Sequence, residues 1–438
     1  MKAFLTYFPA CLITAVLLSC AGNGSEIVTA DKGAGTKMID GNILKSTVNR
    51  ENASAPAEDI ALVAEANNEF AWAMFNELFS KDNNLVFSPY SISTALSMAW
   101  VGARGETSVE MQQALRFPFG GARFHAAMNS IDLQLKSRGQ GSTGKDEGGF
   151  SLKVNNALWG EQTMQFFIHF LDTLACYYDA GMGLCDFINN PDPARLKINS
   201  WISDQTGGKI SELLGPGSIG ALTRLVITNT IYFDAAWADT FQPGRTKQRS
   251  FYPTESDSMK AWFMEREGKY NYFEDESFQA IEIPYSGNQV SMIMLLPKNK
   301  QFLPSETFIN NDIVKALLAG LTSKKTYVRI PKFSFTIGSI SIKQRLIDLG
   351  MRLAFTGMAD FSGICDYPLF ITDVFHNAFI AVDEKGTTAA AGTAAIITTG
   401  ISDGVFFADH PFIFLIRDVT ANQALFIGYV SEPAAVEQ

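Results

Sequence analysis

One uncharged segment near the C-terminus constrains the fold of this chain more than any other feature. Residues 386–402 read GTTAAAGTAAIITTGIS, 17 residues without a charge, an aromatic ring or a proline. Its five Thr, three Gly and one Ser make a poor membrane span, and Gly392 and the β-branched residues disfavour a buried helix. The glycines suit a flexible loop, but loops are usually polar and rich in proline.

A strand explains the composition of this segment better. One face of that strand would carry only small or apolar side chains, namely Thr387, Ala389, Ala391, Thr393, Ala395 and Ile397. The other face is equally uncharged. An exposed segment of this kind is an open template for strand pairing, which proteins normally suppress. Its presence indicates a loop that is built to become a strand.

Composition excludes several classes of protein. The chain has 438 residues, of which 47% are apolar, so it can bury a large core and is not disordered overall. Its net charge is −10 and no Lys/Arg run stands out, which argues against a nucleic-acid partner. CxxC, HExxH and GxSxG are absent, which argues against zinc ribbons, redox motifs, zincins and α/β-hydrolases. We therefore expect no metal and no cofactor.

The N-terminus predicts export. Lys2 precedes a 16-residue, mostly apolar run, Ala3–Leu18, which is short for a membrane span and typical of a secretion signal. Leu17-Leu18-Ser19-Cys20 resembles a bacterial lipobox, so residues 1–19 are predicted to be a signal peptide and Cys20 to be lipidated. The alternative is an ordinary secretion signal. We expect an exported bacterial lipoprotein, anchored in a membrane at the periplasmic face or the cell surface.

Residues 20–56 are predicted to be a flexible tether, because this stretch is rich in Gly, Asn, Ser, Thr and Lys. Apolar residues at helical spacing begin near Asp59, and no second linker or repeat follows. Residues 57–438 therefore form one predicted domain. Its Cys176, Cys185 and Cys365 are expected to be buried thiols, although a Cys176–Cys185 bridge is possible from sequence.

The predicted domain mixes helices and strands without a βαβ rhythm, which favours an α+β fold. Ser88-Pro89 supplies an N-cap and a first helical residue. Further predicted helices are 107–115, 125–135, 166–177, 193–206 and 342–349. The predicted strands are 152–158, 225–233, 280–284, 290–296, 327–335, 378–382, 412–417 and 424–430.

The chain resembles the serpin family along residues 60–434. The motifs, in the order of the family, are Asn84–Ile92, Ile198–Trp201 with Thr206–Ile210, Asn229–Phe233 with Trp237, Ile330–Phe333, Ala359–Ser362, His376, Val382–Thr393, Asp409–Phe412 and Leu425–Gly428. The resemblance implies the serpin fold, with three β-sheets, eight or nine helices and an exposed reactive-centre loop at about 384–405.

The resemblance also implies function as a suicide inhibitor of serine endopeptidases. The target would cleave the loop as an acyl-enzyme, and the cut loop would insert into the central sheet. The alternative is a serpin-fold carrier or binding protein that does not inhibit. An enzyme is disfavoured, because no nucleophile–base pair is spaced for catalysis.

The hinge of the family's loop matches a run of small, uncharged residues after Glu384: Gly386, Thr387, Thr388, Ala389, Ala390, Ala391, Gly392 and Thr393. Such residues can enter a sheet without burying an unpaired charge. Counting the family's usual spacing from Glu384 places the reactive bond at Gly400–Ile401, with Thr398 and Thr399 as alternatives. A residue without a side chain suits the shallow pocket of an elastase-like protease. Subtilisin-like and papain-like proteases remain alternatives.

Two further groups of residues match regions that support loop insertion in the family. Ser88, Ser91, Asn229 and His376 match the shutter, which controls separation of the central strands, and Trp237, Lys332 and Glu384 match the breach, where the loop enters. A lone histidine such as His376 would otherwise be read as a satisfied core residue. Residues 121–139 contain only three basic residues, so no glycosaminoglycan site is indicated. We expect a monomer.

Overall fold

The computed structural model describes residues 27–28, 35–39, 43–138, 150–208, 210–299, 309–387 and 402–433. Among them are eight α-helices: α1 Ala57–Leu78, α2 Pro89–Trp100, α3 Gly105–Ala114, α4 Gly121–Lys136, α5 Ile168–Tyr178, α6 Pro191–Gln205, α7 Asn311–Gly320 and α8 Lys343–Asp348. None of the helices in this part of the chain is both long and apolar enough to cross a membrane. The α+β architecture predicted from the sequence is confirmed.

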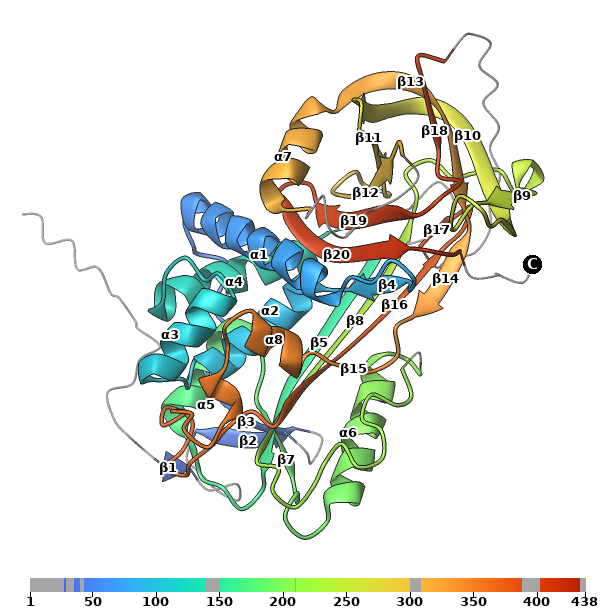
Figure 1. Cartoon of the computed structure of the whole chain (residues 1–438). Helices are drawn as coiled ribbons and strands as arrows, with labels where there is room; N and C mark the ends of the chain where they lie inside the picture. Colours follow the sequence, from blue (N-terminus) through green and yellow to red (C-terminus); the bar gives the residue numbers. More distant parts are fainter. Residues whose placement is uncertain are drawn as a thin grey trace, which may run out of the picture.

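The long strands form what we call the central sheet (Figure 1). Its order is β14-β16-β17-β8-β5-β7-β3-β2, with β15 beside β16. The bounds are β14 Phe333–Thr336, β16 Asp373–Val382, β17 Gly386–Thr387, β8 Leu225–Ala236, β5 Phe150–Glu161, β7 Met182–Cys185, β3 Ile43–Ser46, β2 Thr36–Ile39 and β15 Ile340–Ser341.

A second sheet covers one end of the molecule (Figure 1). Its order is β18-β13-β10-β11-β12-β19-β20-β4, with β9 beside β10. The bounds are β18 Gly404–Phe407, β13 Thr322–Pro331, β10 Met259–Glu274, β11 Phe278–Pro284, β12 Val290–Pro297, β19 Phe412–Asp418, β20 Gln423–Val430, β4 Leu85–Phe87 and β9 Lys247–Phe251. The third sheet has two strands, β1 Ile27–Val28 and β6 Phe166–Phe167.

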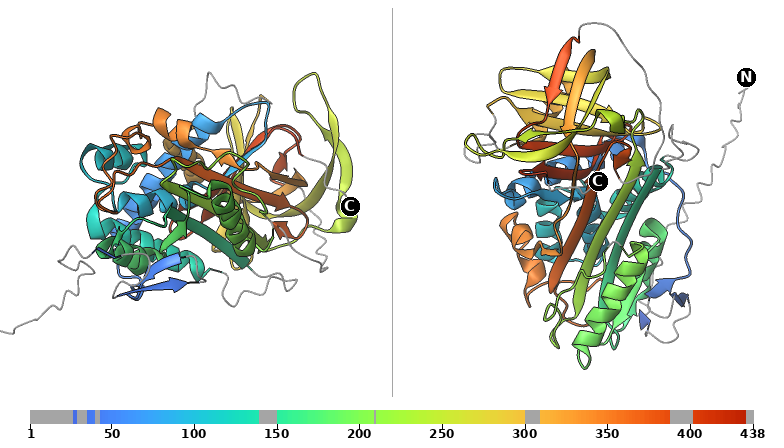
Figure 2. Two further views of the ribbon diagram at one scale, coloured as in Figure 1. Left: turned by 90° about the horizontal axis from the view of Figure 1, so that it is seen from below. Right: turned by 90° about the vertical axis from the view of Figure 1, so that its right-hand side faces the viewer.

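Both faces of the central sheet are covered, which explains its continuous apolar strands. Along β8, Leu225 and Ile227 belong to the main core, whereas Val226 packs into a second apolar cluster under α6. Figure 2 shows α6 across one side of the long strands and the α1–α4 group on the other. Helix α2 is buried along its whole length and contacts both β5 and β8.

Several predicted elements differ in detail from the structure. The predicted strand 327–335 is two strands, β13 and β14, which belong to different sheets and meet at Pro331-Lys332. Phe166 and Phe167 form β6 rather than the first turn of α5. Helix α7 and the 16-residue strand β10 were not predicted. The three domain cysteines are free and buried, as expected.

The described part of the predicted tether is packed against the domain. Strands β2 and β3 form a hairpin, and β3 pairs with β7 at the edge of the central sheet. Arg50 donates to Asn129 and forms an ion pair with Asp132 of α4. Residues 36–39 and 43–56 are therefore not a free spacer, because their backbone and side chains find partners on the fold. The signal peptide and Cys20 lie outside the described residues.

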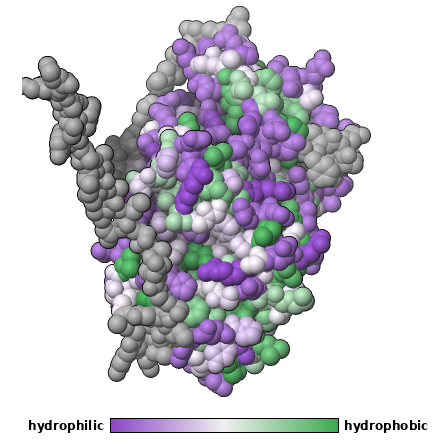
Figure 3. Space-filling view, turned by 90° about the vertical axis from the view of Figure 1, so that its left-hand side faces the viewer, coloured by the Kyte–Doolittle hydropathy of each residue, from purple (hydrophilic) through white to green (hydrophobic). Residues whose placement is uncertain are grey.

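The exposed large apolar side chains are scattered along the chain and include Leu222, Met358 and Tyr367. On the face that Figure 3 presents, hydrophobic and hydrophilic residues are interspersed in small groups. Exposed apolar residues that are scattered singly are common on protein surfaces and need no partner to explain them.

Candidate functional site

The three predicted breach residues lie together where β16 ends. Lys332 Nζ lies 2.9 Å from Glu384 Oε2, and the Thr246 hydroxyl donates to Glu384 Oε1 at 2.7 Å. The Trp237 indole donates to the carbonyl of Asp383 at 3.0 Å. Burial acts to raise the pKa of Glu384, but the hydrogen bonds from Thr246 and Lys332 outweigh it and hold that pKa below its usual value.

Asp383 reverses the chain at this point, a role that the sequence analysis missed. Its carboxylate accepts the backbone N–H groups of Lys385 and Gly386, and its own N–H donates to the Gly386 carbonyl. Aspartate commonly makes such turns by bonding the backbone two or three residues ahead. The turn sends the chain back between β16 and β8.

The first two hinge residues already lie in the central sheet as β17. Thr387 pairs with Val382 of β16 on one side and Ala235 of β8 on the other, and Gly386 pairs with Ala236. Thr387 is 1% exposed, and its hydroxyl lies 2.8 Å from the phenol oxygen of Tyr285. The hinge residues Thr388, Ala389, Ala390, Ala391, Gly392 and Thr393 lie outside the described residues, as do Thr398, Thr399, Gly400 and Ile401.

Below β17 the central sheet is closed. Strands β16 and β8 pair directly and in parallel, from Asp373 opposite Val226 to Ala378 opposite Ile231. Any further residue of the loop that follows Thr387 into the sheet must therefore separate this ladder. The breach is thus the open end of the sheet.

The four predicted shutter residues meet across this closed ladder. His376 and Asn229 are register partners, and the His376 Nδ1 atom is hydrogen-bonded to Asn229 Oδ1. The Ser88 backbone N–H donates to His376 Nε2 at 3.2 Å, so Nε2 accepts and Nδ1 carries the proton. The Asn229 amide donates to Ser91 Oγ at 2.6 Å. The network therefore joins both strands to the start of α2.

A fifth member of the shutter, Asn156 of β5, was missed from sequence. Its side-chain oxygen accepts from Asn229 and Ser91, and its amide donates to the Ser91 carbonyl. The available signal was a polar residue within an apolar strand pattern. His376 is fully buried, and burial lowers its pKa to about 3, so the ring is neutral and its hydrogen bonds hold the closed sheet.

The chain beyond the loop is fixed to the second sheet. Strand β18 runs parallel to β13, and the Ser402 hydroxyl donates to Glu267 of β10. The Arg329 guanidinium lies 4.0 Å from the centre of the Phe407 ring. The chain is therefore held on both sides of the loop, at Thr387 and at Ser402. Within the described ranges, no group of three His, Cys, Asp or Glu side chains is placed to hold a metal ion.

Comparison with known proteins agrees with this geometry. The family model for serpin, a serine protease inhibitor, matches residues 65–433. An uncharacterized serpin-like protein of Thermococcus kodakarensis is 36% identical over 377 residues, which is 85% of this chain and 86% of that protein. The leukocyte elastase inhibitor of Bos taurus is 34% identical over 385 residues, 85% of this chain and 99% of that protein.

The fold is also similar to that of a solved structure, human thyroxine-binding globulin complexed with thyroxine. The TM-score is 0.76 at 25% identity, with 86% of this chain and 99% of that chain covered. Relatives of this kind cover nearly all of the domain that carries the breach and the shutter. The chain belongs to the serpin family.

Proposed function

We propose that this protein inhibits a serine endopeptidase by covalent trapping. The observation that carries the proposal is the half-open central sheet: Gly386 and Thr387 occupy the top of a gap between β16 and β8, and the same two strands are paired below it. A strand that has begun to enter a sheet, and that is followed by small uncharged residues, can continue into it when cleavage frees its far end.

The chemistry belongs to the target protease. Its catalytic serine oxygen attacks the carbonyl carbon of Gly400, and the serine proton passes through the protease's base to the Ile401 nitrogen as the peptide bond breaks. The product is an ester between the protease and Gly400, and the Ile401 side remains on β18. Insertion of the released strand then carries the ester-linked protease away before water can hydrolyse the bond.

A glycine at the reactive bond best matches an elastase-like target. Subtilisin-like and papain-like proteases are the alternative targets. The test mixes the purified protein with a panel of these proteases and reads denaturing gels and intact mass. We expect a denaturant-resistant 1:1 adduct, with cleavage within two residues of Gly400–Ile401. Cleavage of the loop by every protease, with full retention of protease activity and no adduct, would overturn the proposal.

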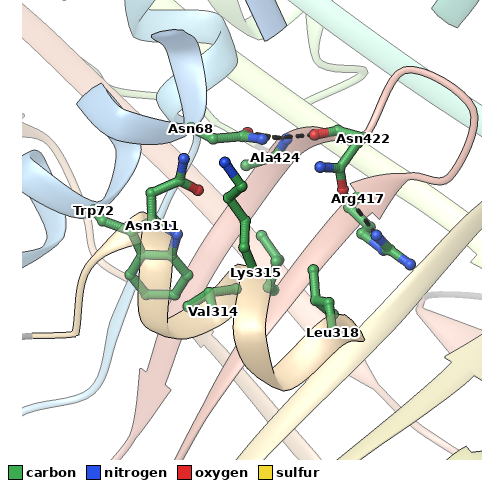
Figure 4. A pocket seen from close by; sticks show the side chains of 10 residues that line it. Asn68, Trp72, Asn311, Val314, Lys315, Leu318, Arg417, Asn422 and Ala424 are labelled. Atoms are coloured by element: carbon green, nitrogen blue, oxygen red, sulfur yellow. Dashed lines mark hydrogen bonds between the residues drawn. The ribbon is translucent and has the colours of Figure 1, made fainter. Parts of the chain in front are cut away.

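A carrier function is the second candidate, because the similar thyroxine-binding globulin was solved with a bound ligand. Figure 4 shows a pocket between α1, α7 and the β19–β20 turn, lined by Trp72, Lys315 and Arg417 among others. Its volume is about 10 Å³, roughly the space of a single water molecule. A second pocket, beside β10–β12, has a volume of about 250 Å³, opens to solvent and is lined by Lys269, Glu282 and Asn288 among others. Neither favours a hormone-sized ligand.

The site of action is part of the proposal. Lipidation of Cys20 after export would hold the domain at a membrane, where it would meet extracellular or periplasmic proteases. The variant Cys20→Ser is expected to be exported but soluble, whereas the wild type should partition into detergent. Identical partitioning of the two proteins would contradict the anchor and leave the inhibitor proposal untouched.

A further inference from the structure

A buried hydrogen bond fastens the inserted hinge to the second sheet. Tyr285 follows β11 and is fully buried, and its hydroxyl lies 2.8 Å from the Thr387 hydroxyl. Its ring stacks on Trp237, with centroids 4.5 Å apart and planes 11° from parallel. Tyr285 therefore joins two parts of the breach, the tryptophan under the turn and the hinge itself.

The surroundings give the Tyr285 hydroxyl no other partner in the described part of the chain. Its ring neighbours are Trp237 and Phe233, both buried. Burial raises the pKa of Tyr285, so the group is a neutral hydroxyl at any physiological pH. If the hinge left the sheet, this hydroxyl would lose its hydrogen bond to Thr387, which shifts the equilibrium between the seated and the expelled hinge by roughly tenfold.

The register of β17 decides which states contain this bond. Thr387 is already paired with Val382 and Ala235 on its two sides. If residues 388–400 follow it into the sheet, Thr387 can keep its place and the bond is retained. If the hinge withdraws, the bond is lost. The Tyr285–Thr387 hydrogen bond is therefore present when the hinge is inserted and absent when it is expelled. It does not oppose further insertion.

We infer that Tyr285 is a positioning residue that keeps the hinge seated in the central sheet, so that insertion starts from Thr387 and not from an expelled loop. The effect of Tyr285 on protease trapping rests on the proposed inhibitory function. Its effect on the position of the hinge does not, and can be measured without a protease. Weakening the bond raises the population with an expelled hinge. Insertion is then slower to begin, and more of the acyl-enzyme is hydrolysed before trapping.

Two variants remove the bond from opposite sides. Tyr285→Phe deletes the phenol oxygen and keeps the ring stack, and Thr387→Val deletes the hinge hydroxyl with little change of shape. The control is Tyr178→Phe, which removes a hydroxyl that is hydrogen-bonded to His125, between α5 and α4. That hydrogen bond joins two helices and involves neither β17 nor Tyr285.

The first readout is hydrogen exchange of the Gly386 and Thr387 amides in the intact protein. Each of Tyr285→Phe and Thr387→Val should exchange roughly tenfold faster there, and the double variant no faster than either single variant, because both lose one shared bond. Tyr178→Phe should match the wild type. Unchanged exchange in both single variants, or effects that multiply in the double variant, would overturn the inference.

The second readout is the number of inhibitor molecules consumed per protease trapped, measured with a protease that forms an adduct with the wild type. We expect this ratio to rise for both variants and not for the control. A rise in exchange without a rise in this ratio would overturn the consequence for trapping. The variants could exchange faster while neither they nor the wild type form an adduct with any protease. That result would keep Tyr285 as the residue that seats the hinge, and would overturn the proposed function instead.

Discussion

Gly386 packs directly against the backbone of Ala235. A Cβ atom added to Gly386 would lie 2.1 Å from the Ala235 carbonyl oxygen and 2.7 Å from the Ala236 Cα atom. Gly386 is not among the glycines with positive φ, so a left-handed backbone does not explain why a glycine stands here. Its role is close approach: without a side chain, β17 fits beside β8.

The variant Gly386→Ala should therefore resist seating of the hinge. Because the clash is with backbone atoms, β17 or β8 must shift, at about 1–3 kcal/mol. We expect a substrate-like protein that is cleaved with little adduct, measured as inhibitor consumed per protease trapped. The matched control is Gly357→Ala, where an added Cβ atom meets nothing within 4 Å. An unchanged ratio in Gly386→Ala would contradict this role.

The Lys332–Glu384 pair predicts a pH dependence of the breach. The pKa of Glu384 is lower in the folded state than in the unfolded chain, so its stabilising contribution is complete above about pH 4.5 and is lost as pH falls through the folded pKa. Glu384→Gln should cost about 1.5–3 kcal/mol at pH 7 by urea unfolding. The difference from wild type should shrink at low pH. A difference that is constant with pH would show that the charge of Glu384 is not involved.

His376 predicts a second pH effect, in the shutter. The unfolded chain protonates a histidine near pH 6.5, whereas the buried ring does so at about 3. Between these values the unfolded state binds more protons, so stability falls as pH falls. From pH 7.5 to 5, wild type should lose about 2 kcal/mol more than His376→Gln.

The control for that comparison is His169→Gln, because His169 is a partly exposed histidine on α5. Burial and the nearby Arg104 lower the pKa of His169 as well, so His169→Gln should weaken the pH dependence in the same direction, but by less than His376→Gln because His169 is only partly buried. Equal pH dependence of wild type and His376→Gln would contradict a neutral, buried shutter histidine.

The packed N-terminal stretch predicts that Arg50 stabilises the domain. Its guanidinium donates to Asn129 Oδ1 at 2.8 Å and to Asp132 Oδ2 at 2.6 Å. Arg50→Ala should lower the free energy of unfolding by about 1.5–3 kcal/mol. Lys37→Ala, at an exposed position in the same stretch, should change it by less than about 0.5 kcal/mol. Equal free energies of unfolding for the two variants would show that the contacts of Arg50 do not stabilise the domain.

The strong periodic segments and the motifs were readable from the sequence. Ser88 and Pro89 begin α2 as expected, with the Ser88 hydroxyl accepting the Ser91 N–H. Helix α7 was not predicted, although its signal is equally local: Asn310 caps it, and Ile313, Val314 and Leu317 follow at helical spacing. These signals are local, so one sequence is enough to detect them.

The contacts that matter most at the breach are not local. Tyr285 meets Thr387 across 102 residues, and β3 pairs with a strand about 140 residues away. Neither partner carries a sequence signal, since a buried tyrosine and a four-residue strand are common features. The two-residue insertion of β17 likewise depends on how β16 and β8 separate, which only the sheet register shows.

Trapping by insertion requires that the protein become more stable when the loop enters the central sheet. A thermal melt of the intact and the loop-cleaved protein tests this most directly. A non-target protease should cut near Gly400, with the site mapped by mass. Seating the freed strand adds about a dozen ladder hydrogen bonds, at roughly 1 kcal/mol each. We predict that the cleaved protein, with both fragments still associated, melts at least ~20 °C above the intact one. Ordinary nicking of a surface loop loosens a fold, so a cleaved form that melts at or below the intact temperature would contradict trapping by insertion.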